Sequence, residues 1–117
     1  MVNEKTNKMS VLLTLIVPRT LADSLADELM QIESVSGFTQ DEVLGFTKRP
    51  KAMTTAEQVV GRQQMSRFEL FIFTEDISVI LSALSNHKVG SQIHYSIMPV
   101  NQHQHGMITN IRYEALQ

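Results

Sequence analysis

The sequence predicts an α+β protein, a ferredoxin-like βαββαβ sandwich with an additional short C-terminal strand. Three observations favour this fold. The most apolar segments, residues 10–17 and 65–73, are each followed by a helical pattern and then by a further strand-like segment. These two segments fall at the first and third strand positions, which lie at the centre of a ferredoxin-like sheet. The length of 117 residues, 43% of them hydrophobic, supports one domain over residues 10–117, preceded by a flexible arm at residues 1–9.

The first half of the chain contains a strand, a helix and a second strand. Residues 10–17 carry leucine and β-branched residues at both odd and even positions, which indicates a strand covered on both faces. Thr20 is a candidate N-cap for the helix that follows. The apolar stripe of this helix has helical spacing and consists of Leu21, Leu25, Leu29 and Ile32. Gly37 favours a chain reversal after the helix, and a second strand is expected over residues 38–48.

The second half repeats this order after a long loop. Residues 47–64, which include Pro50 and Gly61, are predicted to form that loop. A third strand at 65–73 leads into a helix whose start is marked by Thr74, Glu75 and Asp76. Its apolar stripe consists of Ile77, Ile80, Leu81 and Leu84. A fourth strand is expected near 93–100 and a short fifth strand near 107–113.

The predicted sheet has one face without helices. In this fold both helices pack on the same face, so Leu12, Ile16, Phe71 and Phe73 are expected on the other. A large exposed apolar face usually marks a partner surface. We therefore expect a homo-oligomer that packs these faces together. The alternative is a monomer whose N-terminal arm or tail strand folds across the face.

The composition excludes several classes of protein. The absence of cysteine excludes disulfide scaffolds, Cys-type zinc sites and thiol catalysis. The net charge of −2 gives no general attraction to nucleic acid. The apolar run 11–17 ends at Pro18, well short of the ~20 residues that a membrane helix needs, so we expect a cytoplasmic protein without direct membrane insertion. No nucleophile elbow, P-loop or dinucleotide fingerprint occurs, and we expect no enzymatic activity.

Three segments together carry a resemblance to a known family. They are Glu42-Val43-Leu44-Gly45-Phe46 with Lys48-Arg49, the run from Phe68 to Asp76, and Val89-Gly90 with Ile97-Met98-Pro99-Val100. In their order and spacing they resemble the PII-like nitrogen-regulatory superfamily. The resemblance implies a homotrimer that binds a ligand in clefts between subunits. It also implies signalling to a partner, a transporter or an enzyme, through the long loop between strands two and three.

The resemblance also suggests which residues bind a ligand or partner. The loop base and its basic cluster comprise Gly45, Phe46, Lys48, Arg49, Lys51 and Arg62, and the opposite wall of the cleft comprises Gly90, Ser91 and Gln92. Arg67 is expected to join the basic cluster. Well-characterised members of the superfamily have a second glycine and a lysine where this chain has Ser91 and Gln92, so ATP and 2-oxoglutarate sensing is not expected here. The alternative reading of the cluster is a set of solvated loop charges.

A second function class rests on His103-Gln104-His105. In an extended chain the two imidazoles point the same way, and Met98 and Met107 lie within a few residues. Histidine with methionine suits copper, zinc or nickel. The alternative function is therefore a metal-binding protein, with a link to metal efflux implied by relatives in the resembling superfamily. His94 could join this site, and the structural alternative is an exposed polar turn.

Overall fold

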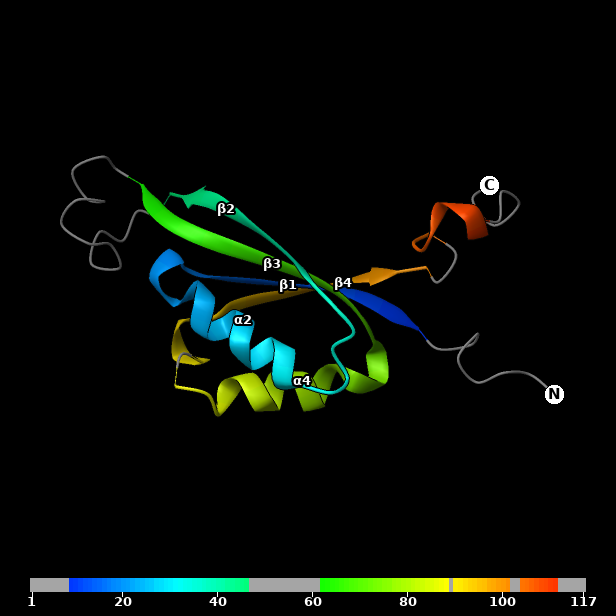
Figure 1. Cartoon of the computed structure of the whole chain (residues 1–117), viewed down its shortest axis with the longest axis horizontal. Coiled ribbons are helices and arrows are strands. Elements are labelled where there is room, and N and C mark those ends of the chain that lie inside the picture. Colours follow the sequence, from blue (N-terminus) through cyan, green and yellow to red (C-terminus); the bar gives the residue numbers. More distant parts are fainter. Residues whose placement is uncertain (1–8, 47–61, 89, 102–103, 112–117) are drawn as a thin grey trace.

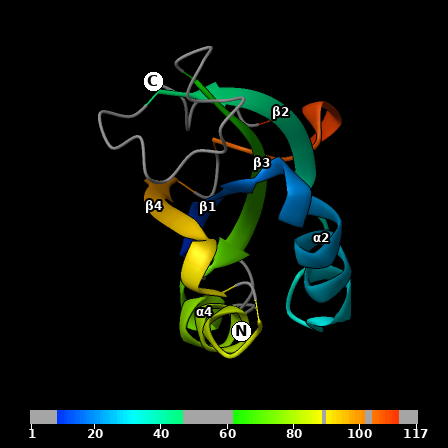
Figure 2. The ribbon, with the colours of Figure 1, turned by 90° about the vertical axis from the view of Figure 1, so that its left-hand side faces the viewer.

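The computed structural model describes residues 9–46, 62–88, 90–101 and 104–111. Four strands form one antiparallel sheet in the order β2-β3-β1-β4, and both helices lie on one of its faces (Figures 1 and 2). In chain order the main elements are β1 (Ser10–Pro18), α2 (Ala22–Gln31), β2 (Thr39–Gly45), β3 (Gln63–Phe73), α4 (Ile77–Ser85) and β4 (His94–Val100). Short 3-10 turns are η1 (Arg19–Leu21), η3 (Thr74–Asp76), η4 (Gly90–Gln92) and η5 (Ile108–Asn110). This is the predicted ferredoxin-like arrangement.

The two most apolar strands occupy the centre of the sheet, as the sequence predicts. β1 pairs with β3 over its whole length, from Ser10 opposite Phe73 to Pro18 opposite Met65, and with β4 along its other edge. β2 pairs only with β3. A central strand has its backbone bonded on both edges, so it can be buried without leaving peptide groups unpaired. β2 and β4 are therefore the two edges of the sheet.

The core lies between this sheet and the two helices. Alternate residues of β1 and β3 point toward the helices, because successive side chains of a strand point to opposite faces. Each helix contributes the buried part of its apolar stripe, with α2 beneath the β2–β3 half of the sheet and α4 beneath the β1–β4 half (Figure 2). The buried hydrophobic side chains of the described residues are Val11, Leu13, Leu15, Val17, Ala22, Leu25, Leu29, Phe68, Leu70, Ile72, Ile80 and Leu84.

Two sequence predictions about the elements are wrong. Thr20 does not cap the first helix, because it lies inside the turn Arg19–Leu21, and α2 begins at Ala22 without a side-chain cap. The described part of the predicted fifth strand is a 3-10 turn, Ile108–Asn110. The backbone N–H groups of Asn110 and Ile111 donate locally, to the carbonyls of Met107 and Ile108, and so cannot bond to a neighbouring strand.

The longest helix of the described ranges has ten residues, and no helix there has the length and apolar character that crossing a membrane requires. The predicted arm at 1–9 and the loop at 47–64 lie almost wholly outside the described residues. Met9 is described, and its carbonyl accepts bonds from both the backbone N–H and the hydroxyl of Thr74.

Candidate functional site

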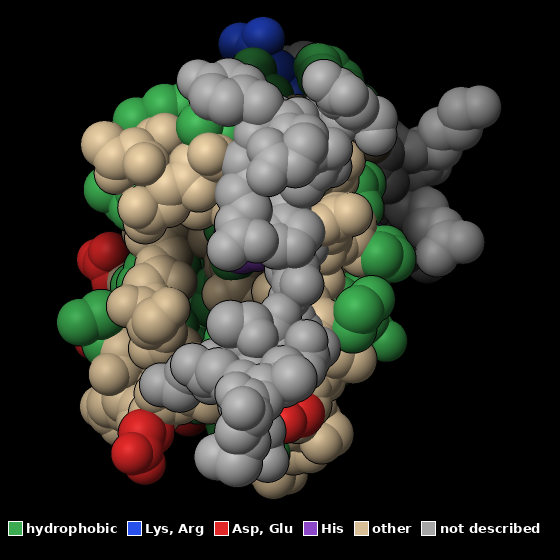
Figure 3. Space-filling model, turned by 90° about the vertical axis from the view of Figure 1, so that its right-hand side faces the viewer, with side chains coloured by type: hydrophobic (Ala, Val, Ile, Leu, Met, Phe, Trp, Pro, Cys, Tyr) green, Lys and Arg blue, Asp and Glu red, His purple; other side chains and the backbone are tan. Residues whose placement is uncertain are grey.

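The face of the sheet opposite the helices, here called the open face, is divided into an apolar end and a polar end. At the apolar end the strand register places Leu12 between Phe71 and Met98. Phe71 is 48% exposed and Met98 is 64% exposed. Figure 3 looks at this end of the molecule and shows hydrophobic side chains exposed on both of its flanks. No helix of the described residues covers this face (Figure 1).

The polar end of the open face consists of two cross-strand rows. In one row Thr14 lies between Glu69 and Ser96. In the next row Ile16 lies between Arg67 and His94. The sequence predicts an apolar face from Leu12, Ile16, Phe71 and Phe73, and these residues do lie on it. Because polar residues alternate with them across the sheet, the apolar area is concentrated around Phe71, Leu12 and Met98.

The C-terminal segment lies over the apolar end through one stacked pair of rings. The imidazole of His105 stacks on Phe71 with ring centroids 4.5 Å apart and an interplanar angle of 7°. Nε2 of His105 is buried, and it has no hydrogen-bond partner among the described residues. This contact covers part of one ring, and it leaves Phe71 half exposed.

A bidentate ion pair joins β2 to β3 at the polar end. Nη2 and Nε of Arg67 donate to the two carboxylate oxygens of Asp41 at 2.7 and 3.1 Å, with Glu69 at 4.0 Å. The hydrogen bond to Asp41 and its negative charge raise the pKa of Arg67. Arg67 was expected among the cations at the loop base. That expectation is wrong, because Arg67 lies within β3 and pairs with Asp41.

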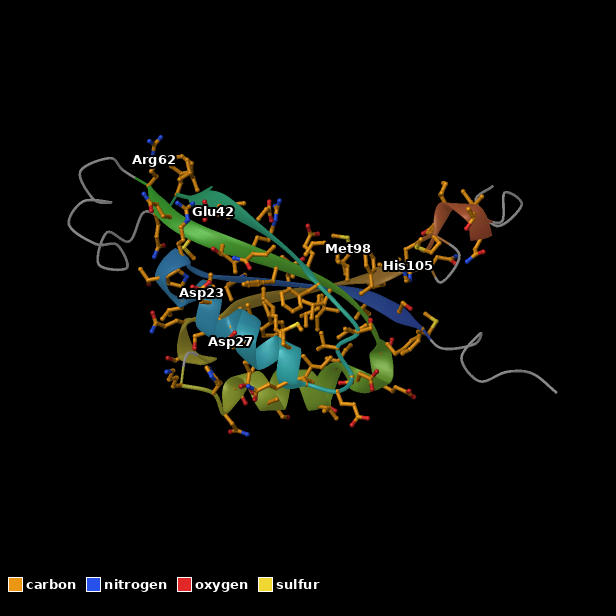
Figure 4. All side chains as sticks on the ribbon, in the orientation of Figure 1. Asp23, Asp27, Glu42, Arg62, Met98 and His105 are labelled. Atoms are coloured by element: carbon orange, nitrogen blue, oxygen red, sulfur yellow. The ribbon has the colours of Figure 1, made fainter. Side chains whose placement is uncertain are left out.

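The predicted loop base and the predicted wall lie at the same end of the sheet. Gly45 pairs with Gln63, so β2 ends and β3 begins at the same end of the sheet (Figure 1). β4 begins at that end too, because His94 pairs with Ile16, and η4 (Gly90–Gln92) immediately precedes it. Figure 4 shows Arg62 and Glu42 at this end and Met98 and His105 at the other.

Within one chain, the described parts of these two groups lie on different strands of the sheet. The loop base continues β2 and β3, whereas η4 leads into β4 at the opposite edge. Strands lie ~4.8 Å apart, so the outer edges of this sheet are roughly 14 Å apart. Phe46 is 75% exposed and Arg62 is exposed, while Lys48, Arg49 and Lys51 lie outside the described residues.

Gly90 is held tightly against the end of α4. A Cβ at this position would lie 2.5 Å from the carbonyl oxygen of Leu84 and 3.0 Å from that of Ser85. The backbone is fixed there by bonds from Gly90 N to His87 O and from Ile93 N to Gly90 O. The resemblance assigns this glycine to the wall of the ligand cleft. Its close approach to the helix backbone is a separate reason for glycine at this position.

The histidines of the described residues do not converge. No group of three or more His, Asp or Glu side chains in the described ranges could hold a metal ion, and His103 lies outside them. His87 pairs with Glu28 at 3.6 Å, which links the end of α4 to α2. His94 is four residues along β4 from Met98, roughly 13 Å in an extended strand, so it cannot share a site with His105.

Sequence reasoning missed a cavity of ≈ 420 Å³ between α4, β1 and β4. The serines Ser78, Ser82 and Ser85 line one side of it. Their spacing of four and three residues already placed them on one face of a helix. Which strand they face depends on contacts distant in the sequence, and no local pattern contains that information.

Comparison with known proteins identifies the family. The family model described as "Protein of unknown function (DUF3240)" matches residues 7–108. The chain belongs to the DUF3240 family. No curated protein matches its sequence.

Solved structures agree with this assignment. This DUF3240 chain is similar to a DUF3240 family protein from Shewanella baltica, with 25% identity, a TM-score of 0.67 and coverage of 85% of this chain and 96% of that one. It is also similar to a putative PII-like signaling protein from Thermus thermophilus, with 19% identity, a TM-score of 0.56 and coverage of 80% and 88%. A Bacillus cereus protein related to NIF3 matches at 18% identity and a TM-score of 0.59, over 81% of this chain but 26% of that one. The likeness to the Thermus thermophilus structure shows a shared fold, in agreement with the predicted ferredoxin-like arrangement.

Proposed function

We propose that this DUF3240 protein is a non-enzymatic PII-like regulatory module that works as a homotrimer. It signals to a protein partner, a transporter or an enzyme, through the loop at 47–64. The observation that carries the proposal is the apolar end of the open face, where Phe71, Leu12 and Met98 form a cross-strand row that no helix of the described residues covers. A further copy of the chain is the occupant that fits this face best.

The charges around the apolar row favour association with a second copy. Arg67, Asp41 and Glu69 lie on the same face, so the face carries both signs of charge. A surface with an apolar centre and charges of both signs at its border can be complementary to a copy of itself. A basic or acidic macromolecule would meet like charges on part of it.

The arrangement of the predicted ligand residues favours clefts between subunits. Loop base and Gly90 wall lie at the same end of the sheet but on opposite edges. A head-to-tail ring of subunits brings the β2 edge of one copy toward the β4 edge of the next, and such rings close with cyclic symmetry. A ligand in that cleft would shift the population of loop conformations. The cations Lys48, Arg49, Lys51 and Arg62 favour an anionic ligand or an acidic partner surface.

Two matched variants test the trimer. Phe71→Glu places a charge in the apolar row, and Val79→Glu places the same charge on the exposed side of α4, where Val79 is 58% exposed. Light scattering after size-exclusion chromatography should give a smaller molar mass for Phe71→Glu and the wild-type mass for Val79→Glu. Equal masses for both variants, with both folded by circular dichroism, would contradict the proposal.

A second candidate function is metal binding by His103 and His105. The observation that favours it is the buried Nε2 of His105, a potential ligand atom without a hydrogen-bond partner in the described ranges. Met98 lies toward the same end of the molecule (Figure 4), and a thioether with imidazoles suits copper in particular, with zinc and nickel as alternatives. Three copies in a trimer would present three such pairs.

Titration with metal ions tests whether His103 and His105 bind a metal. Zn²⁺ or Cu²⁺ that binds the folded chain raises its melting temperature by mass action. The double variant His103→Ala/His105→Ala should lose the rise. The control His87→Ala removes the histidine that pairs with Glu28 and should keep it. If the double variant retains the full rise, these histidines do not hold the metal.

A further inference from the structure

The cavity of ≈ 420 Å³ beneath α4, here called the α4 pocket, lies on the helix side of the sheet. Its floor includes Leu15 of β1 and Leu84 of α4, both buried, and its walls include Leu81 and Ile93. Leu15 points away from the open face, because its strand neighbours Thr14 and Ile16 lie on that face. The α4 pocket is therefore separated from the open face by the whole sheet, and it shares Gly90 with the proposed cleft between subunits.

The mouth of the α4 pocket is polar but uncharged. Ser78, Ser82 and Ser85 line it from α4 and Tyr95 lines it from β4. The hydroxyl of Ser85 donates to the carbonyl of Ser82 at 2.9 Å. Within the described residues, the hydroxyls of Ser78, Ser82 and Tyr95 have no protein partner, and each can both donate and accept a hydrogen bond. No Asp, Glu, Lys or Arg of the described residues lines the cavity.

One wall of the pocket is rigid. Gly90 lines it and is packed so closely against the carbonyls of Leu84 and Ser85 that no side chain fits there. Hydrogen bonds from Gly90 to His87 and from Ile93 to Gly90 hold this turn in place. A pocket with a fixed wall is preformed, so a ligand does not lose affinity to ordering that wall.

We propose that the α4 pocket binds a small uncharged molecule with an apolar body and one or two hydrogen-bonding groups. The volume lies in the range of ligand pockets, ~300–1,000 Å³. A charged ligand would lose its hydration without meeting an opposite charge. An apolar body fits against the leucines and Ile93, and its polar group meets the serine hydroxyls or the phenol of Tyr95. This site goes beyond the proposed regulatory function and does not depend on the trimer.

The probe for this site is N-phenyl-1-naphthylamine, which is uncharged and fluoresces in apolar surroundings. Its sulfonated relative, 8-anilino-1-naphthalenesulfonate, is the matched anionic probe. The chain has two tyrosines and no tryptophan, so in a Tyr113→Phe variant Tyr95 is the sole emitter. We expect saturable binding of the uncharged probe at one site per chain, with loss of Tyr95 emission by energy transfer to it. Weaker binding of the sulfonate is expected.

Paired variants locate the probe. Ser82→Phe places a ring at the mouth, and Val79→Phe places the same ring on the exposed part of α4 outside the pocket lining. Ser82→Phe should weaken binding at least about tenfold, which is 1.4 kcal/mol, and Val79→Phe should leave it unchanged. Phe71→Glu should also leave it unchanged. If Ser82→Phe does not fold, Ser78→Phe, which also places a ring at the mouth, takes its place.

Three results would overturn the inference. The first is no saturable binding of the uncharged probe. The second is binding that disappears in Phe71→Glu, which would place the probe on the open face. The third is equal binding of the anionic probe, which indicates unspecific attachment to apolar surface.

Discussion

The substitution Gly90→Ala tests the account of the turn before β4. The new methyl group would lie 2.5 Å from Leu84 O, 3.0 Å from Ser85 O and 3.1 Å from Ser85 Cα. All three are backbone atoms at the end of α4, so they cannot move aside as the tip of a flexible side chain can. Gly90 does not have a positive φ, since among the described glycines only Gly106 does, and the effect therefore comes from space alone.

The expected loss of stability follows from these contacts. Forcing an extra carbon into a packed site costs typically about 1–3 kcal/mol, and contacts with backbone favour the upper half of that range. For a domain of this size, 1 kcal/mol corresponds to roughly 4 °C in melting temperature, so we expect a fall of roughly 8–12 °C. The change should appear in the urea midpoint, with an unchanged slope, because the surface exposed on unfolding hardly changes.

Gly37→Ala is the matched control. No atom lies within 4 Å of a Cβ at Gly37, and its φ is not positive. Alanine there should leave the free energy of unfolding unchanged or raise it by about 0.4–1 kcal/mol through the unfolded state. Urea unfolding of both variants, followed by circular dichroism, provides the comparison. If Gly90→Ala is as stable as Gly37→Ala, the reasoning about the turn is refuted.

Three further substitutions test the core, the ion pair and the start of the domain. Phe68→Ala, which truncates a fully buried ring, should lower the free energy of unfolding by about 3–5 kcal/mol, and a loss below 1 kcal/mol in urea titrations would contradict the assigned core. Asp41→Asn should shift the urea midpoint less than Gly90→Ala does, and the shift should vanish at about 1 M salt, since the pair with Arg67 is exposed. Since the pKa of Arg67 is raised, its guanidinium stays charged throughout the neutral and mildly alkaline range. The contribution of the ion pair to stability should therefore not fall between neutral and mildly alkaline pH. Thr74→Val should cost about 0.5–1.5 kcal/mol through the lost hydroxyl bond to Met9, and no change in thermal unfolding would show that this bond contributes nothing.

The central part of the fold follows from local patterns. β1 and β3 are recognisable because apolar residues occupy both odd and even positions, and so both faces, of each strand. Only a central strand of a layered protein requires this pattern. The helices are recognisable because Leu25, Leu29, Ile80 and Leu84 recur at helical spacing and are buried. The apolar face of each strand or helix therefore determines which other element it packs against.

The features that the sequence does not reveal depend on contacts between distant residues. Arg67 reads as a loop cation until the register places it opposite Asp41. The α4 pocket exists because Tyr95 and the serines of α4 meet around it. The stack of His105 on Phe71 joins two segments with no shared periodicity. The 3-10 turn at Ile108–Asn110 replaces the predicted strand because its donors bond locally.

Sedimentation equilibrium gives the molar mass of the purified wild-type chain at micromolar concentration. This measurement tests most directly whether other copies of the chain cover its open face. The proposal predicts three times the 13.2 kDa chain mass, stable on dilution through that range. A single species of 13.2 kDa would contradict it, and the ring of subunits with its shared clefts would have to be abandoned.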